Sequence, residues 1–403
     1  MSKLEKLIQQ YCPDGVVWKM FYDVCDLIRG ITYNKSQEAK TETEDAHKVL
    51  RANNITLYLN VLNFEDVKLV SKDVVVKPEQ HLYAGDILMC AGSGSKEHVG
   101  KVAFISENID YTFGGFMAVV RCKAGILPRY MFHILSSHYF SSHLDVQINS
   151  STINNINKQV MQSFAFPVPP LPVQEEIVRV LDAFTELQAE LQAELQKRKQ
   201  QYNFYRDNLL NFKDINRGGQ EIKWMKMSEI GNNLDKKRKP ITAGKREPGQ
   251  IPYYGASGIV DYVKDYLFDG DYLLVSEDGA NLLTRTYPIA FSIHGKTWVN
   301  NHAHVIEFKE RATRKYVEYY LNSIDLSPWI SAGAQPKLTQ DSLNKLTIPV
   351  PPLAEQQKIV SILDRFDTLT NDLTSGLPAE IEKRRQQYEF YRDKLLTFKR
   401  KEA

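Results

Sequence analysis

Residues 166–184 read FPVPPLPVQEEIVRVLDAF, and residues 348–366 read IPVPPLAEQQKIVSILDRF. The two segments are identical at 11 of 19 positions and lie 182 residues apart. A second pair, KRKQQYNFYRDNLLNFK at 197–213 and KRRQQYEFYRDKLLTFK at 383–399, is identical at 13 of 17 positions. This period is too long for a solenoid, whose units span about 20–50 residues. The chain is therefore interpreted as one module written twice.

The two pairs of segments divide the 403-residue chain into four parts. Residues 1–165 and 214–347 differ from each other, whereas residues 166–213 and 348–403 carry the matching segments. Each matching part opens with PVPPL. Proline fixes φ and biases the preceding residue towards an extended form, so PVPPL predicts a stiff exit from a globular domain.

A long helical pattern follows each PVPPL segment. From about Val173 to Phe212, apolar residues recur at alternating steps of three and four, which predicts a coiled-coil helix of about 60 Å. The second copy repeats the pattern, but its SGLPAE stretch (375–380) predicts a break, because glycine and proline are poor residues for a helix interior. A helix this long cannot bury its apolar stripe on one small domain. We therefore expect the two helices to pack as an antiparallel pair related by a pseudo-twofold axis.

The two variable parts share an order of features despite their different sequences. Each has an early tryptophan, then a strand opened by Gly-Asp, GDILMC (85–90) and GDYLLV (270–275). Each then has an aromatic-rich helical stretch, RYMFHILSSHYF (129–140) and RKYVEYYLNSI (314–324). This order predicts that the same α+β domain occurs twice, with different residues on its surface. Asn157 and Thr339 are expected to cap the last short helix of each domain.

Composition indicates a globular protein with 43% hydrophobic residues and a net charge of only +2. The N-terminal sequence is too polar for a secretory segment, and no apolar run approaches the ~18 residues of a membrane span. The four cysteines form no CxxC pair. They are expected to be reduced thiols, as in a cytoplasmic protein. With so little net charge, a nucleic-acid partner would have to meet a local cluster of basic residues.

Such a cluster lies in LDKKRKPITAGKREPGQIPYYGASG (234–258), which holds six basic residues and no acid between 236 and 246. Lysines suit phosphate contacts, which are sequence-blind, while arginine and amide side chains can also read base edges. The predicted DNA contacts of this stretch are Lys236, Lys237, Arg238, Lys239, Lys245, Arg246, Tyr253, Tyr254 and Ser257.

Weaker candidates lie in polar loops elsewhere, because asparagine and glutamine can bind adenine through two hydrogen bonds. In the first variable part they are Arg29, Tyr33, Asn34, Lys35, Ser93, Ser95, Lys96, Lys101 and Asn155. In the second they are Asn300, Asn301, His302, Gln335 and Lys337. His302 and His304 alternate along a strand, but no further ligand follows at metal-binding spacing, so no metal site is predicted.

The paired PVPPL–Q–IV–LD–F blocks, the paired QQY–FYRD–LL–F blocks and the GAQPKLT loop (333–339) together resemble the specificity subunit of type I restriction–modification systems. The resemblance covers the whole chain. It implies a non-catalytic reader of double-stranded DNA, whose two target-recognition domains each read one half of a bipartite, asymmetric site. It also implies that the helices set the distance between the halves and dock two methyltransferase subunits, through which restriction subunits join.

The repeated FYRD blocks are the expected contacts of these methyltransferase subunits, through Tyr205, Arg206, Tyr391 and Arg392. The sequence contains no P-loop, no amino-methyltransferase motif and no nuclease constellation, so the partners are expected to supply the chemistry and the S-adenosylmethionine. The competing interpretation is a protein scaffold, with two adaptor domains on a coiled-coil rod and no role in DNA binding. The basic loop and the unlike variable domains argue against it.

Overall fold

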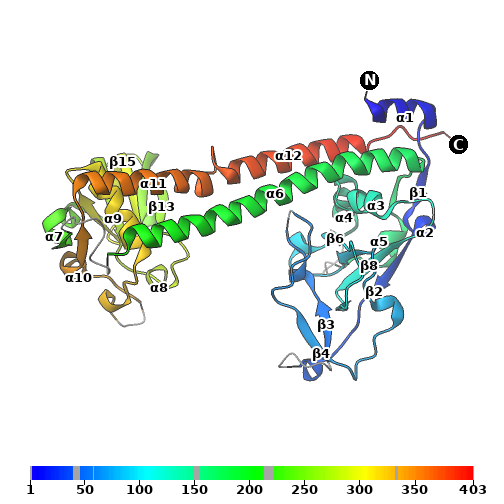
Figure 1. Ribbon diagram of the computed structural model, residues 1–403, viewed down its shortest axis with the longest axis horizontal. Coiled ribbons are helices and arrows are strands. Elements are labelled where there is room, and N and C mark those ends of the chain that lie inside the picture. The colour runs from blue at the N-terminus through cyan, green and yellow to red at the C-terminus, as the bar shows by residue number, and fades with distance from the viewer. Residues whose placement is uncertain are drawn as a thin grey trace. The chain divides into compact units, whose positions relative to one another are not determined.

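The computed structural model describes residues 2–39, 46–57, 59–148, 155–212, 222–331 and 335–402 (Figure 1). The chain forms two compact units. The first unit comprises Met1–Ala193 and Glu380–Ala403, and the second comprises Glu194–Ala379. The unit borders therefore fall inside the long helices, whereas the repeat borders of the sequence fall at their ends.

The central sheets of the two units have the same strand order. In the first unit the order is β2-β8-β5-β6, and in the second it is β11-β16-β14-β15, with antiparallel pairing throughout these four strands. The predicted α+β fold and its duplication are thus confirmed. The strands are β2 (Cys25–Arg29), β8 (Met117–Cys122), β5 (Ile87–Cys90) and β6 (Val102–Phe104), and β11 (Asn232–Asn233), β16 (Ala303–Glu307), β14 (Phe268–Ser276) and β15 (Ala290–Val299).

Each unit adds its own strands to this frame. The second unit extends its sheet with a hairpin, β12 (Pro248–Gly255) and β13 (Gly258–Val263), which joins β15 in parallel. The first unit instead has a separate sheet, ordered β4-β3-β7. Its strands are β3 (Ala46–Leu50), β4 (Lys68–Ser71) and β7 (Thr112–Phe113). The frame is thus shared, and the insertions differ.

Helices of the same kind cover the two sheets. Residues 129–140, predicted as one helix, form two, because the chain turns at Ser136 and Ser137. Asn157 Oδ1 accepts from Val160 N at 3.0 Å, and Thr339 Oγ1 accepts from Ser342 N at 3.2 Å, so both predicted caps are confirmed. The helices are α1 (Lys3–Tyr11), α2 (Phe21–Val24), α3 (Pro128–Leu135), α4 (His138–Ile148) and α5 (Lys158–Gln162), and α7 (Met227–Ile230), α8 (Asn281–Thr284), α9 (Arg311–Ser323) and α10 (Gln340–Lys345).

The first and last strands of each domain pair beside PVPPL. In the first unit β1 (Trp18–Met20) pairs with β9 (Ala165–Pro167), and in the second β10 (Lys223–Lys226) pairs with β17 (Thr347–Val350). Tyr130 Oη donates to the Pro167 carbonyl at 3.0 Å, and Tyr316 Oη to the Pro349 carbonyl at 2.6 Å. Because these tyrosines lie on α3 and α9, each domain is tied to the start of its own long helix in the same way.

The long helices are α6 (Leu171–Leu210), α11 (Leu353–Asn371) and α12 (Leu377–Leu395). The predicted break between α11 and α12 is confirmed. Gly376 lies there against the carbonyl oxygens of Asp372 and Leu369, and a Cβ at this position would come within 2.9 Å of both. The break therefore needs a glycine.

Each unit combines helical segments from both repeats. In the first unit, the ring of Phe184 on α6 stacks on Tyr391 of α12, with centroids 5.5 Å apart. In the second, Phe366 on α11 stacks on Tyr205 of α6 at 5.4 Å. Within each unit the paired helices run in opposite directions (Figure 1). The FYRD block of one repeat thus completes the unit formed by the other repeat.

Candidate nucleic-acid interface

Three chain segments meet at one end of each central sheet, and equivalent backbone hydrogen bonds hold them. In the first unit, Ala91 N donates to the Phe116 carbonyl at 2.9 Å, and Ile156 N donates to the Ala91 carbonyl at 2.7 Å. In the second, Glu277 N donates to the His302 carbonyl at 2.9 Å, and Leu338 N to the Glu277 carbonyl at 2.8 Å. We call these two places the loop ends.

The loop end of the first unit brings together three of the predicted DNA contacts. Arg29 Nη2 donates to Asn155 Oδ1 at 3.0 Å and to the Ile156 carbonyl. Asn155 pairs with Gly92, the neighbour of Ser93. Arg29, Ser93 and Asn155 come from three different segments, so only the fold brings them together.

The other candidates of the first unit differ in their surroundings. Asn34 and Lys35 are exposed, whereas Tyr33 is half-buried against a small apolar cluster. Lys96 Nζ forms an ion pair with Asp145 at 3.1 Å, and Ser95 Oγ donates to a neighbouring glutamate. Lys101 Nζ donates to the Ile55 carbonyl at 2.5 Å, and burial lowers its pKa. Lys101 therefore anchors a loop, and we revise its predicted role to positioning.

In the second unit the basic loop keeps four lysines exposed: Lys236, Lys237, Lys239 and Lys245. The loop backbone is held by aromatic side chains beneath it. Tyr253 Oη accepts from Ile241 N at 3.0 Å, and Trp298 Nε1 donates to the Lys239 carbonyl at 2.6 Å. Tyr253 is only 1% exposed, so its predicted role is revised from touching DNA to supporting the loop.

Arg246 also supports the loop. Its guanidinium lies 4.4 Å from the centre of the Tyr253 ring, donates to the Ile241 carbonyl at 3.1 Å, and pairs with Asp261 on β13 at 2.9 Å. The hydrogen bond to Asp261 raises the pKa of Arg246. Through its contacts with Ile241 and Asp261, Arg246 links the basic loop to the β12–β13 hairpin.

Arg238 lies under the loop rather than on its surface, with its side chain 12% exposed. Nη1 donates to Glu277 Oε2 at 2.6 Å and to the Ala303 carbonyl at 2.8 Å, and Nη2 lies 3.3 Å from Asp235 Oδ2. A side chain held by these contacts would have to break them to reach a groove. The predicted DNA contact of Arg238, through a phosphate or a base edge, is therefore revised to a structural role.

Asp235, Glu277 and His304 form a group with possible metal ligands within 4.8 Å of one another, which the sequence spacing did not reveal. Burial would raise the pKa of Glu277, but hydrogen bonds from Arg238 and Lys337 outweigh it, so that pKa is lowered. His304 Nδ1 lies 2.6 Å from Asp235 Oδ2. The guanidinium and the ammonium supply the positive charge that a cation would otherwise bring, so this group is a buried ion-pair network.

The remaining candidates of the second unit lie around this network. Asn300 is buried, and its Oδ1 accepts from His302 N at 2.8 Å, so it shapes the turn rather than facing solvent. His302 Nδ1 lies 2.9 Å from both Asp278 oxygens. Lys337 pairs with Asp278 through the backbone and with Glu277 through its Nζ, at 3.0 Å. Asn301, Ser257 and Gln335 are exposed, and Tyr254 is half-buried.

Comparison with known proteins identifies this architecture. The family model described as "Type I restriction modification DNA specificity domain" matches residues 13–198 and again residues 220–383. The chain belongs to this family. The matches cover both repeats, and thus more than half of the chain.

Related specificity subunits match parts of the chain. A putative type I restriction enzyme specificity subunit of Haemophilus influenzae is 40% identical over 182 residues, which are 44% of this chain and 47% of that protein. A specificity subunit of a type I restriction enzyme of Escherichia coli is 36% identical over 261 residues, 59% of this chain and 62% of that protein. A putative type I specificity subunit of Mycoplasma pneumoniae is 30% identical over 258 residues, 62% of this chain and 92% of that protein. The chain thus spans about half to three fifths of the length of the first two relatives.

Solved structures show the same fold over nearly the whole chain. The type I restriction–modification S subunit from M. genitalium has a TM-score of 0.58 at 15% identity, covering 95% of this chain and 96% of that one. A chain from a study of complex assembly and conformational transition of the type I restriction–modification system also has a TM-score of 0.58, at 14% identity, covering 95% and 98%. Among the described residues, no helix is both long and apolar enough to cross a bilayer.

The specificity domains also carry exposed residues that the sequence patterns did not single out. Phe116 is 73% exposed at the loop end of the first unit. In the second unit, Leu283 and Tyr287 are 54% and 61% exposed in the β14–β15 connection, the counterpart of the connection that holds Ser93. Aligning the two repeats by their Gly-Asp strands would have pointed to this connection, since it follows the strand in both copies.

The two FYRD blocks of the chain present the same exposed aromatic pair twice. Phe204 and Tyr205 are 64% and 45% exposed, and Phe390 and Tyr391 are 63% and 42% exposed. The second residue of each pair also stacks within its own unit. The arginines that follow are less accessible. The guanidinium of Arg206 lies 5.7 Å from the ring centre of Tyr202, and that of Arg392 lies 5.4 Å from the ring centre of Tyr388. Both arginines therefore pack on the helix surface, and their contact with a partner stays a prediction.

Proposed function

We propose that this chain is the DNA-recognition subunit of a type I restriction–modification complex, reading a bipartite, asymmetric site in double-stranded DNA. Each unit reads one half of the site with its loop end. The observation that carries this proposal is one strand frame used twice, with different side chains at the same loop end. A protein that recognises two different DNA half-sites needs the same scaffold twice, with different DNA-contacting side chains on each copy.

The exposed lysines of the basic loop hold the second unit on the DNA backbone. Lys236, Lys237 and Lys239 lie in one short segment, and phosphate contacts from lysine add affinity without sequence preference. The frame that presents them is fixed by Arg238 and Tyr253 beneath them. Base reading then falls to the exposed polar side chains that remain at the two loop ends.

The chain itself carries out no catalysis in this proposal. Two methyltransferase subunits bind the two repeated aromatic pairs, at Phe204–Tyr205 and Phe390–Tyr391, because symmetric partners require repeated surfaces. They bring the S-adenosylmethionine, and restriction subunits join through them. The assembled complex acts in the cytoplasm, where its DNA substrate lies.

Salt titration of DNA binding by the full chain with its methyltransferase tests this proposal. Changing Lys236, Lys237 and Lys239 together to glutamine should weaken binding to every sequence and flatten its salt dependence, by about 0.9 in log–log slope for each lost phosphate contact. The matched control changes Lys223, Lys226 and Lys309, which are equally exposed but lie on or beyond β10 and β16, away from the loop. Equal losses from both triple variants, or no DNA retention by the parent complex, would favour the scaffold interpretation.

A further inference from the structure

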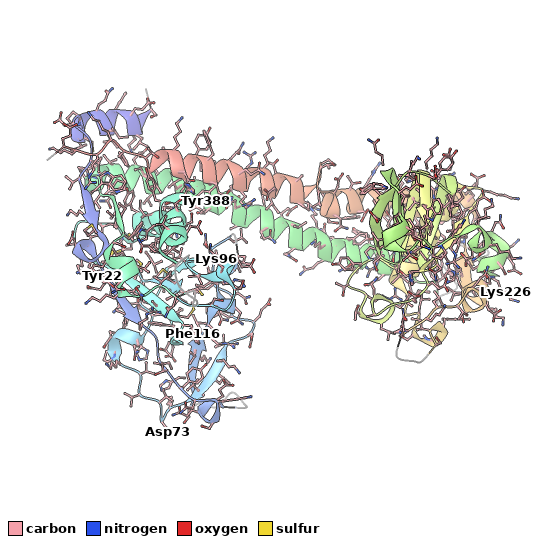
Figure 2. All side chains as sticks on the ribbon, turned by 180° about the vertical axis from the view of Figure 1, so that it is seen from behind. Tyr22, Asp73, Lys96, Phe116, Lys226 and Tyr388 are labelled. Atoms are coloured by element: carbon pink, nitrogen blue, oxygen red, sulfur yellow. The ribbon has the colours of Figure 1, made fainter. Side chains whose placement is uncertain are left out.

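Phe116 is the most exposed aromatic side chain among the described residues, at 73%. It lies just before β8, in the turn that connects β7 to β8, and is labelled in Figure 2. Exposed apolar residues are common on protein surfaces, so its exposure alone carries no argument. The position of Phe116 is informative, because it lies at the loop end of the first unit together with Arg29, Ser93 and Asn155.

The backbone around Phe116 is held on both sides. Ala91 N and Gly92 N both donate to the Phe116 carbonyl, each at 2.9 Å, and Met117 N donates to Gly114 O at 2.7 Å. Gly115 has no room for a side chain, because a Cβ there would lie 2.9 Å from Thr32 Cγ2 and 3.3 Å from the Ile31 carbonyl. A rigid turn therefore holds the ring in solvent.

The same position of the second unit carries a different side chain. His302 is the counterpart of Phe116, because its carbonyl accepts from Glu277 N at 2.9 Å just as the Phe116 carbonyl accepts from Ala91 N. Each precedes the second strand of its sheet, β8 or β16. His302 is a polar side chain held by Asp278, whereas Phe116 has neither donor nor acceptor. The two units thus differ in chemistry at one fixed point of a shared frame.

We propose that Phe116 is a specificity-determining residue of the first unit, which places its ring against the methyl group of a thymine in the half-site that this unit reads. The inference rests on the proposed function. A phenyl ring cannot hydrogen-bond a base edge, and the thymine methyl is the apolar group that the major groove displays. The neighbouring Ser93 and the exposed Asn155 supply the hydrogen-bonding groups that such a contact lacks, and Arg29 holds Asn155 in place.

The test begins with methylation-site sequencing of cells that express the full chain, or its Phe116→Ala variant, with the cognate methyltransferase. The variant should relax discrimination at one T·A pair of one half-site and leave the other half-site unchanged. Phe116→Leu, which keeps an apolar side chain, should retain the preference. An unchanged site in the alanine variant, or relaxation at a G·C pair, would overturn the inference.

A second measurement needs no variant and is unaffected by misfolding. In a synthetic duplex of the site, uracil replaces thymine at the relaxed pair, or at each T·A pair of the half-site in turn if Phe116→Ala fails to fold. Binding of the parent complex should weaken roughly fourfold at one pair, since burial of one methyl group contributes about 0.8 kcal/mol. Equal binding of thymine and uracil duplexes at every pair would show that no methyl contact exists. If the parent complex methylates no bipartite site at all, the proposed function itself fails, which is a separate outcome.

Discussion

Replacing Arg238 with glutamine tests whether this arginine stabilises the fold beneath the basic loop or contacts DNA itself. In the structure this arginine neutralises Glu277 and Asp235, whose side chains are only 11% and 4% exposed. Glutamine would leave two buried carboxylates beside His304, with the half-exposed Lys337 on Glu277 as the remaining cation. Breaking a buried ion pair by removing one partner costs about 3–5 kcal/mol.

The second unit has 186 residues, from Glu194 to Ala379. For a unit of this size, 1 kcal/mol corresponds to about 2–4 °C in the unfolding midpoint. Arg238→Gln should therefore lower the midpoint of this unit by roughly 6–20 °C. The control Arg365→Gln, at an exposed position of α11, should stay within about 0.5 kcal/mol of the parent.

Thermal unfolding with hydrogen exchange as the local probe measures this effect in the full chain. Exchange protection should fall around the basic loop and in β14 and β16, which contact the ion-pair network. The reasoning is wrong if Arg238→Gln melts like the parent while its methylation site loses one base position. That result would return Arg238 to the DNA contact that the sequence predicts.

Three further predictions follow from the helices and their joints. Burial lowers the pKa of His133 despite its hydrogen bond to Asp182, so the unfolded chain takes up a proton near pH 6.5 while the folded one does so only at lower pH. The stability of the first unit should therefore fall as the pH drops below about 6.5, and His133→Gln should flatten that slope in pH-dependent unfolding. Inserting one QAEL into QAELQAEL (188–195) lengthens α6 by about 6 Å and should lengthen the unread spacer by one or two base pairs, with both half-sites unchanged, in methylation-site sequencing. Phe204→Ser and Phe390→Ser should each cause the loss of one of two methyltransferase subunits, as measured by the mass of the complex. If the parent chain binds only one methyltransferase subunit when that subunit is in excess, the docking proposal is contradicted.

The duplication could be predicted from the sequence because the connections between each domain and its long helix repeat the same residues. PVPPL, the break at 375–380, and the caps Asn157 and Thr339 all depend on local backbone preferences, and the structure has each of them where expected. In each domain the first and last strands pair beside PVPPL, so both ends of the domain meet at the start of its long helix.

The roles of individual charged residues could not be predicted from the sequence, because they depend on ion-pair partners that lie far away along the chain. The sequence predicts Arg238 as a DNA contact, but the fold places Glu277, 39 positions away, against it. Arg246 looked free until the hairpin placed Asp261 beside it. A phenylalanine such as Phe116, after two glycines and before an apolar strand, reads as a core residue, and only the tight turn at Gly115 places it in solvent.

The most direct test of the account exchanges one recognition domain. Residues 214–347 of the full chain would be replaced by the corresponding part of a relative, and methylation sites would be sequenced beside those of the parent, with the same methyltransferase. The account predicts a bipartite site in which one half changes, while the other half and the spacer stay the same. A contiguous site, or a change in both halves, would contradict the claim that each unit reads its own half.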